Sequence, residues 1–385
     1  YEKVATAKLT TGPQQTQTAM PVRLGGCGML RFQDLRAQAW LGSWLQTLPG
    51  VRALGGPGVA TREAIEAGTR GWAAALREAV EELAGEGVYL DHAGVVTAEA
   101  PAQAWGWEDG APALAQRQRH LGRRRSEAAR GRLLATLPPR QRARLRSCGG
   151  SGAGAWLLAA PTGAATRLTD LEDKVCARLR LRVPLHMGGE GGRCRNRRSG
   201  DATEEPAGGR AGGECLESLD ADAFHALICL VGGRVIRRHH TLRDLLAGVG
   251  HEAGYVSATE VYEPAWTRAR TNARGEVEVE HARLDNRFNG PPADPLVYGD
   301  VVVTHPEAAA WLQAAADRDG AAAAGAAKGK HARYPPFALP GGRLVPFSVE
   351  TFGRWGGEAL EFLRAAAEAT CERSPQLACK GSWGP

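Results

Sequence analysis

Two aspartates and two lysines near the C-terminal end of the chain have the types and order needed to cleave a phosphodiester bond. Asp285 and Asp300 are separated by fourteen residues, which fits a β-hairpin whose adjacent strands bring both carboxylates to one cation. Mg²⁺ or Mn²⁺ bound there would activate a water and neutralise charge on the leaving oxygen. Lys328 and Lys330 follow, and either could supply an ammonium group. The alternatives are acids that merely flank a hairpin and lysines that end a solvated helix.

Three further residues could assist such chemistry. Arg238 and His239 stand at the start of an amphipathic helix expected over residues 236–249, where Arg can hold a phosphate and His can bind one or move a proton. Glu260, on the strand expected next, is a possible additional magnesium ligand. Each also has a structural alternative, namely packing of the histidine in the core or an ordinary strand position for the acid.

Three cysteines and one histidine form a second candidate site. His225 and Cys229 are four residues apart, about one helical turn, so both can reach one ion. Cys215 precedes them, and Cys194 is the nearest upstream thiol that could complete a tetrahedron. We therefore predict a closed Zn²⁺ site that stabilises the fold. A buried histidine beside core cysteines is the alternative.

Residues 117–146 hold eleven arginines and a single acidic residue, Glu127. We predict a pair of helices whose guanidinium groups contact phosphates. The alternative is a solvated helix face in an arginine-rich chain, because 42 arginines stand against 6 lysines, as in GC-rich coding. The net charge of +6 permits a polyanionic partner without requiring one. The arginines expected to bind nucleic acid are Arg123, Arg124, Arg125, Arg237 and Arg238.

The chain of 385 residues is long enough for two or three domains. Its eight cysteines are scattered, which favours metal binding in a reducing compartment over a disulfide framework. We find no apolar run of about 18 residues, so a soluble intracellular protein is expected. Because the sequence begins at Tyr1 rather than Met, we expect it to be part of a longer protein.

The hydrophobic patterns predict an α+β fold in several parts. We expect a mostly helical region over residues 1–187, a flexible loop and zinc site over 188–235, a mixed α/β domain over 236–370 and a tail over 371–385. The expected helices span residues 61–84, 117–146 as a pair, 170–182, 236–249, 307–327 and 357–370. The expected strands span residues 255–261, 276–280, the region around 284, 300–304 and 344–350.

The order of these features resembles the C-terminal half of non-LTR (LINE-type) retrotransposon reverse transcriptases that carry a restriction-like endonuclease. PVRLGGCGMLR at residues 21–31 resembles the Gly-Gly element that follows the polymerase core. GSGAGAWLLAAPT at residues 150–162 resembles the small-residue and Trp segment ahead of the zinc knuckle. Cys215, His225 and Cys229 with the following Val-Gly-Gly resemble that knuckle, and Arg-His-His at residues 238–240 resembles the Arg-His-Asn of the family.

The resemblance covers about residues 20–370 and implies both an activity and partners. It implies a restriction-endonuclease-like core of the PD-(D/E)XK type, with Mg²⁺ or Mn²⁺ at the two aspartates and a structural zinc. The implied activity is nicking of target DNA to prime reverse transcription in the nucleus. The implied partners are target DNA, the element RNA and a reverse transcriptase portion N-terminal to this chain.

The chain departs from the family pattern at several places. It contains no Asp-Asp pair and hence no polymerase active site, Cys194 alone stands for the paired first thiols, and Leu284 stands for the proline of Pro-Asp. Val302 stands where most restriction-like nucleases have lysine, so Lys328 or Lys330 would supply the ammonium. The alternative function is a catalytically inactive, nucleic-acid-binding remnant of such an element.

Overall fold

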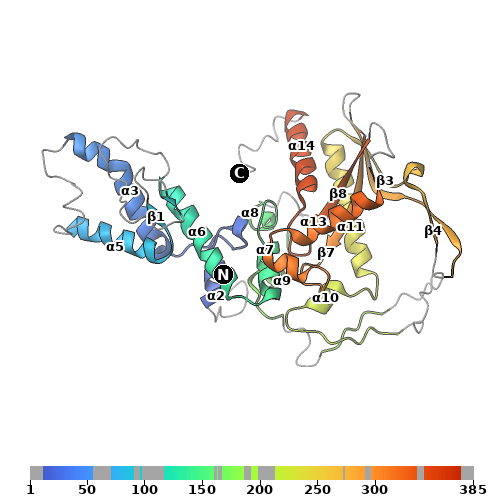
Figure 1. Ribbon diagram of the computed structural model, residues 1–385, viewed down its shortest axis with the longest axis horizontal. Coiled ribbons are helices and arrows are strands. Elements are labelled where there is room, and N and C mark those ends of the chain that lie inside the picture. Colours follow the sequence, from blue (N-terminus) through green and yellow to red (C-terminus); the bar gives the residue numbers. More distant parts are fainter. Residues whose placement is uncertain are drawn as a thin grey trace. The chain divides into compact units, whose positions relative to one another are not determined.

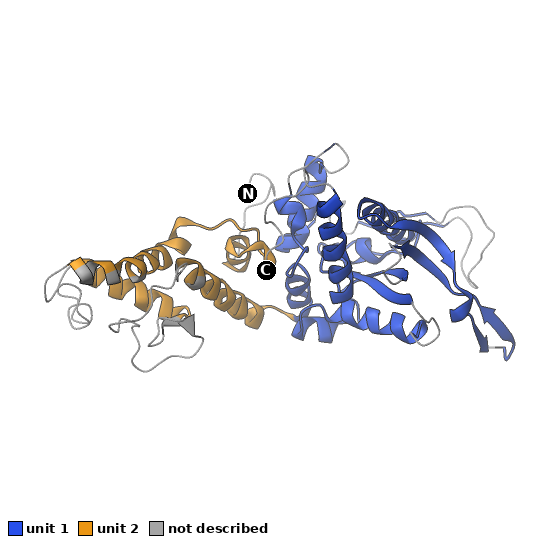
Figure 2. Cartoon of the chain, turned by 90° about the horizontal axis from the view of Figure 1, so that it is seen from above, with its two compact units in different colours: residues 1, 3–6, 139–385 blue, residues 2, 7–138 orange. Residues whose placement is uncertain are grey.

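The computed structural model divides the chain into two compact units (Figure 2). Unit 1 comprises residues 1, 3–6 and 139–385, and unit 2 comprises residues 2 and 7–138. The helical region expected over residues 1–187 is thus shared between the two units. The structure describes residues 12–54, 71–90, 96–97, 117–159, 163, 167–185, 192–197, 213–271, 274–290, 296–335 and 342–373.

Unit 2 consists mainly of helices that bury apolar residues at helical spacing. Its core includes Leu41 of α3, Leu76 of α5 and Leu121 of α6. The helix expected over residues 61–84 is confirmed from Gly71 onward, and its earlier part lies outside the described residues. The elements are α2 (Gly12–Ala19), the 3-10 helix η1 (Val22–Leu24), α3 (Phe32–Leu54), α5 (Gly71–Gly85), β1 (Tyr89–Leu90), β2 (Val96–Thr97) and α6 (Arg117–Thr136).

Unit 1 is organised around a four-stranded sheet with strand order β3-β6-β7-β8 (Figure 1). β3, β6 and β7 pair antiparallel in that order, whereas β7 and β8 run parallel. A parallel pair requires a crossover, and helices α12 and α13 provide it. The strands are β3 (Val256–Tyr262), β6 (Arg283–Asn289), β7 (Leu296–Thr304) and β8 (Gly342–Glu350). The protein is therefore a mixed α+β chain, as the sequence predicts.

Helices pack on both faces of this sheet. On one face α11 (Arg234–Glu252) and α14 (Gly357–Arg373) cover a core in which Phe288, Phe347 and Phe362 meet edge-on or tilted. On the other face α13 (Ala321–Arg333) leads into Tyr334, which packs with Trp266, Leu284, Tyr298 and Leu344. Alternate residues of β7 therefore face two different apolar clusters, and this alternation decides which side chains of β7 face α13.

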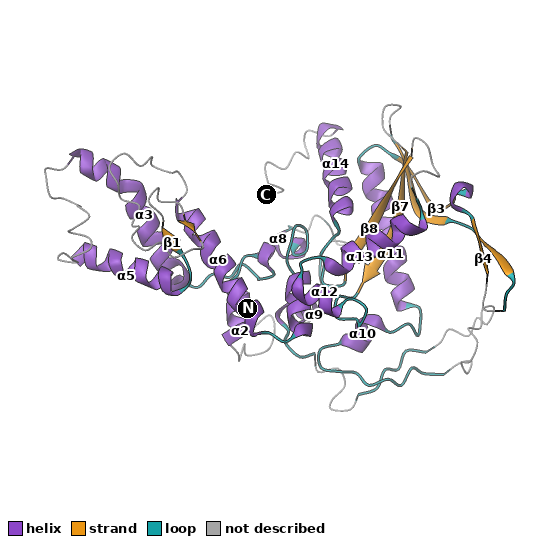
Figure 3. Cartoon of the chain, viewed as in Figure 1, coloured by secondary structure: helices purple, strands orange, loops and turns teal. Residues whose placement is uncertain are grey.

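The remaining helices of unit 1 lie beside the sheet (Figure 3). Ala143 of α7 packs with Ala315 and Ala316 of α12 in a small apolar cluster. The 3-10 helix η3 and a separate antiparallel ribbon of β4 and β5 follow β3 along the chain. These elements are α7 (Pro139–Ser147), α8 (Ala155–Leu158), α9 (Asp170–Leu181), α10 (Phe224–Ile228), η3 (Pro264–Trp266), β4 (Arg268–Thr271), β5 (Val277–Glu280) and α12 (Leu312–Asp317).

The prediction of a single helix over residues 307–327 is wrong. The segment forms two helices, α12 and α13, with a break between them. Gly320, which directly precedes α13, adopts φ +70°, a left-handed backbone conformation that separates α13 from α12. Asp319 lies 2.6 Å from Arg146 of α7, so an ion pair holds the break in place. Within the described parts of the chain, no helix has both the length and the apolar character needed to cross a bilayer.

Candidate functional site

Asp285 and Asp300 lie at the point where two neighbouring strands stop pairing. β6 and β7 are joined from Phe288 opposite Val297 to Asn286 opposite Gly299, and the two aspartates are the next residues on each strand. The two carboxyl groups are close enough for each to shift the pKa of the other, and both side chains are buried. The hairpin spacing in the sequence therefore does bring the two acids together.

Asp285 is held by donors from two elements. The backbone N–H of Val301, beyond the last β6–β7 residue pair, donates to Asp285 Oδ2 at 2.7 Å. His239 Nε2, on α11, lies 3.2 Å from the same oxygen and 3.2 Å from the carbonyl oxygen of Val301. Since both neighbours are acceptors, Nε2 carries the proton. The hydrogen bond from His239 Nε2 therefore orients the carboxylate of Asp285.

Asp300 has an ammonium partner from the opposite side of the sheet. Lys330 Nζ, in the last turn of α13, lies 2.7 Å from Asp300 Oδ2. Lys328 lies two residues earlier, which places it about 200° around the helix, and its side chain is exposed. Of the two lysines considered from the sequence, the structure brings Lys330 to the aspartates. We call Asp285, Asp300, His239 and Lys330 the acidic fork.

The protonation of the acidic fork is uneven. Burial raises the pKa of Asp300 to about 7, against the opposing charge of Lys330 and with the help of neighbouring Asp285. Burial would also raise the pKa of Asp285, but hydrogen bonds from His239, Asp300 and Val301 outweigh it and the pKa is lowered. The hydrogen bond to Asp285 raises the pKa of His239. Below about pH 7 the pair therefore carries one proton, held mainly by Asp300, and a divalent cation would have to displace it.

Glu260, considered as a further magnesium ligand, is engaged elsewhere. Its carboxylate accepts from Arg243 of α11 and lies 2.5 Å from Arg283 Nε. Its backbone φ of +56° interrupts the pairing of β3 with β6 opposite Asp285. The structure thus brings two carboxylates to the fork and keeps a third in an ion-pair cluster beside it.

Tyr334 and Glu350 support the fork without belonging to it. Burial, together with the nearby charge of Asp300, raises the pKa of Tyr334 to about 12, so its hydroxyl stays protonated. Glu350 Oε1 accepts the backbone N–H groups of Ala322 and Ala323 at 3.1 and 3.2 Å, which caps the first turn of α13. Glu350 therefore ends a core strand and fixes the start of a helix.

The four predicted zinc ligands converge within unit 1. The donor atoms of Cys194, Cys215, His225 and Cys229 all lie within 4.8 Å of one another. Cys194 Sγ is 3.7 Å from Cys229 Sγ, which is 3.8 Å from Cys215 Sγ, and Cys215 Sγ is 3.4 Å from His225 Nε2. Thiolates around tetrahedral zinc, with bonds of about 2.3 Å, would lie about 3.8 Å apart. This Cys3His cluster can therefore hold a metal ion such as zinc.

Two local structures position the cluster. Backbone hydrogen bonds join the segments that carry Cys194 and Cys215. In one of them Cys215 N donates to the carbonyl oxygen of Asn196 at 2.9 Å. Asp220 accepts the N–H groups of Phe224 and His225 at 2.8 and 3.0 Å and so caps α10. In the flexible loop and zinc site expected over residues 188–235, residues 188–191 and 198–212 lie outside the described residues.

The cluster also favours thiolate formation at one position. Burial opposes ionisation of Cys229, but hydrogen bonds with Asn196, with the backbone of Val231 and with the other thiols lower its pKa to about 7. A thiolate is the form that binds metal. The arrangement has four ligands and no open position, which suits a structural ion.

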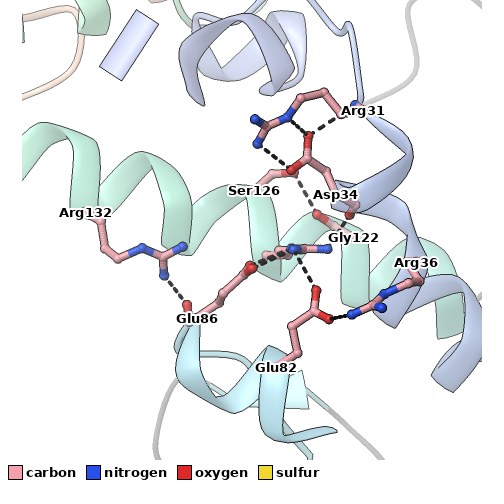
Figure 4. A network of polar contacts seen from close by, with 9 residues as sticks. Arg31, Asp34, Arg36, Glu82, Glu86, Gly122, Ser126 and Arg132 are labelled. Carbon is pink, nitrogen blue, oxygen red and sulfur yellow. Dashed lines mark hydrogen bonds and ion pairs between the residues drawn. The ribbon is translucent and has the colours of Figure 1, made fainter. Parts of the chain in front are cut away.

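The arginines predicted to bind phosphates differ in availability. Arg123 and Arg124 are exposed on α6, where both contact Glu127, at 2.9 and 3.5 Å. Arg125 is only 11% exposed and lies 2.5 Å from Glu86 and 3.3 Å from Glu82. Both glutamates belong to the polar network drawn in Figure 4. Arg125 thus joins the helices of unit 2, and the exposed pair beside it remains available to a polyanion.

Arginines of α7 and α11 show the same division. On α7, Arg144 lies 2.5 Å from buried Glu307, and Arg146 pairs with Asp319, so both attach α7 to the rest of unit 1. On α11, Arg237 is exposed, whereas Arg238 is half-buried and donates through Nη1 to the carbonyl oxygen of Leu227 at 3.3 Å. The sequence alone could not distinguish the exposed arginines from those that attach helices, because nothing in the residue types of 117–146 sets one arginine apart from another.

Comparison with protein-family models and with curated proteins gives no match for this chain. What the molecule does is therefore argued from the geometry of the acidic fork and of the Cys3His cluster.

Proposed function

We propose that the protein is a metal-dependent DNA endonuclease, the nicking portion of a non-LTR retrotransposon reverse transcriptase with a restriction-like core. The observation that carries this proposal is the acidic fork, in which two buried carboxylates meet where β6 and β7 separate and an ammonium lies 2.7 Å from one of them. Paired carboxylates can hold the cation of metal-assisted phosphodiester cleavage, and an ammonium can stabilise the charge on the phosphate.

Each residue of the fork has a proposed role. Asp285 and Asp300 hold Mg²⁺ or Mn²⁺, which when bound activates a water and neutralises charge on the leaving oxygen. Lys330 would turn from Asp300 to a non-bridging oxygen of the scissile phosphate once the cation takes its place. His239 holds Asp285 in its orientation through the hydrogen bond from Nε2. Loss of the shared proton from Asp300 accompanies metal binding.

The other features fit the same activity. The Cys3His cluster holds zinc as a structural ion and stands for the zinc knuckle of such elements. Exposed Arg123, Arg124 and Arg237 contact the phosphates of target DNA or element RNA. The nucleus is then the place of action, with the polymerase portion of the element as a further partner.

A catalytically inactive, nucleic-acid-binding remnant is the second candidate. Its support is Glu260, which is held by Arg243 and Arg283 and leaves the fork with two carboxylates rather than three. Both candidates predict salt-dependent binding of DNA, but only the nuclease predicts cleavage.

Nicking of supercoiled plasmid in Mg²⁺ or Mn²⁺ separates the two candidates. Wild type should produce the open-circular form, and Asp300→Ala and Asp285→Ala should not. Glu260→Gln is the matched control, because it removes a nearby carboxylate that faces arginines. If wild type and Asp300→Ala nick equally or not at all while both bind DNA, the inactive remnant is the correct description.

A further inference from the structure

The Cys3His cluster and the acidic fork are linked by helix α11. Between the last predicted ligand, Cys229, and the first residue of α11, Arg234, lie only four residues. Gly232 and Gly233 adopt φ of +81° and +68°, and a Cβ on Gly232 would lie 3.1 Å from the carbonyl oxygen of Arg197. This short, left-handed turn packs against the segment that carries Cys194. The start of α11 therefore has little freedom apart from the cluster.

Arg238 adds a direct side-chain tie. Its Nη1 donates to the carbonyl oxygen of Leu227, which lies on α10 between His225 and Cys229. Among the ion pairs of the described residues, none joins Arg238 to a carboxylate, and burial lowers the pKa of its guanidinium. A half-buried guanidinium that binds a backbone carbonyl is placed to fix α10 against α11 rather than to neutralise an acid.

The next residue along α11 belongs to the fork. His239 follows Arg238 and is turned about 100° from it around the helix, so one side chain reaches α10 and the other reaches Asp285. One turn further, Asn286 Nδ2 donates to the carbonyl oxygen of Arg243 at 3.0 Å, and Leu246 is buried against Phe288. The sheet thus holds the middle of α11, whereas the Cys3His cluster holds its first turn.

A second contact ties the cluster to the strand of Asp300. His305, directly after the end of β7, is 93% buried and packs edge-on against Phe224 of α10 at 5.1 Å. Arg144 Nη2 donates to the carbonyl oxygen of Asp222 at 3.2 Å. α10 has only five residues, too few to be stable alone, so its place depends on these contacts and on the ion that its His225 and Cys229 can bind.

We propose that Arg238 is a positioning residue that couples metal occupancy of the Cys3His cluster to the placement of His239 at Asp285, and thereby to divalent-cation affinity at the acidic fork. The inference rests on the proposed function for the identity of the fork, and it changes the role expected for Arg238 from phosphate contact to support. Metal in the Cys3His cluster then acts at a distance on the reaction without touching DNA.

The experiment measures Mn²⁺ binding by electron paramagnetic resonance on the full chain in its zinc-loaded form. Arg238→Met, which keeps the apolar stem and removes the donors, should raise the Kd for Mn²⁺ about tenfold, as loss of a supporting hydrogen bond does elsewhere. Arg238→Lys, which keeps a positively charged donor group, should recover part of that affinity. Arg234→Met, an exposed arginine in the first turn of α11, is the matched control and should bind Mn²⁺ as wild type does.

Amide hydrogen exchange distinguishes positioning from general unfolding. In Arg238→Met the amides of residues 235–240 should lose protection, while those of α14 keep theirs. Stripping the zinc from wild type should reproduce both effects, and stripping it from Arg238→Met should weaken Mn²⁺ binding no further. Wild-type affinity and protection in Arg238→Met overturn the inference, as does equal loss of protection in α14.

The outcomes also separate this inference from the proposed function. If Mn²⁺ affinity depends on Arg238 as described but wild type does not nick DNA, the positioning role stands and the nuclease is wrong. If wild type nicks DNA and Arg238→Met leaves Mn²⁺ binding and protection unchanged, the nuclease stands and the positioning role is wrong.

Discussion

Asp300 and Glu350 lie on neighbouring parallel strands and fix opposite ends of the same helix. Glu350 accepts two backbone N–H groups at the start of α13, and Asp300 pairs with Lys330 in its last turn. The two acids are both buried, but their surroundings differ. Glu350 has backbone donors, whereas Asp300 lies beside a second carboxylate and the ammonium of Lys330. Under the proposed function a cation would replace the ammonium at Asp300, whereas Glu350 stays bound to the helix terminus.

Removing the ammonium should impair cleavage much more than removing its neighbour on the helix. We expect Lys330→Met to lower the nicking rate about 100-fold, the usual effect of losing one electrostatic donor. Lys328→Met should nick at close to the wild-type rate, because its side chain is exposed about 200° around α13. Single-turnover nicking at saturating DNA is the measurement. Equal losses in both variants would contradict the assignment of Lys330.

The raised pKa of Asp300 should appear in the stability of the protein without added Mg²⁺ or Mn²⁺. Because its pKa is about 7 in the folded chain and about 3.9 in an unfolded one, Asp300 contributes stability below pH 4 that is lost as the pH rises through 7. Wild type should therefore show a falling Tm between pH 4 and 7. Asp300→Asn should show a flatter profile over the same range.

His239 acts in the same direction, because its pKa is also raised, and His239→Gln separates the two contributions. Asp285, whose pKa is lowered, loses its contribution only at more acidic pH. Identical profiles for wild type and Asp300→Asn would show that the carboxyl is not protonated in the folded chain.

Zinc bound at the Cys3His cluster should be stoichiometric and stabilising. We expect one zinc per chain in the purified protein, and a lower Tm after chelation, because a structural ion contributes its binding free energy to folding. Cys215→Ser should lose the zinc, whereas Cys371→Ser, a change in α14 outside the cluster, should keep it. Elemental analysis and thermal unfolding measure both. Zinc-free protein with an unchanged Tm would exclude the site.

Much of both sites followed from local spacing in the sequence. Fourteen residues between two acids, with turn residues and an apolar run after them, are enough to predict a hairpin that joins Asp285 and Asp300. His225 and Cys229 share a helical turn, and Cys215 with Cys194 completed the set. Such patterns can be predicted because each depends on the geometry of one strand or helix.

What could not be predicted depends on contacts between distant parts of the chain. The choice between Lys328 and Lys330 depends on where α13 begins, and the break at Gly320 that sets this point is held by Arg146, far earlier in the sequence. The pairing of Glu260 with Arg243 depends on how α11 lies on the sheet. No periodicity in the sequence carries that information.

The arginines of α6 should separate into one that supports the fold and two that contact nucleic acid. Arg125→Ala removes the partner of Glu82 and Glu86, so we expect it to destabilise the protein by about 2 kcal/mol, typical of a broken, partly buried ion-pair network. The double variant Arg123→Ala with Arg124→Ala should keep the wild-type Tm, because both side chains are exposed. It should bind unrelated DNA sequences more weakly by similar factors.

The dependence of DNA affinity on salt distinguishes phosphate binding from composition. For each phosphate that is no longer neutralised, the plot of log affinity against log salt should flatten by about 0.9, so the slope of the double variant should be shallower by up to about 2. Nicking at saturating DNA should persist, because these residues lie in unit 2 and the fork lies in unit 1. If the double variant keeps the wild-type slope, Arg123 and Arg124 are solvated side chains of an arginine-rich chain. Unit 1, with Arg237 exposed on α11, would then hold the DNA alone.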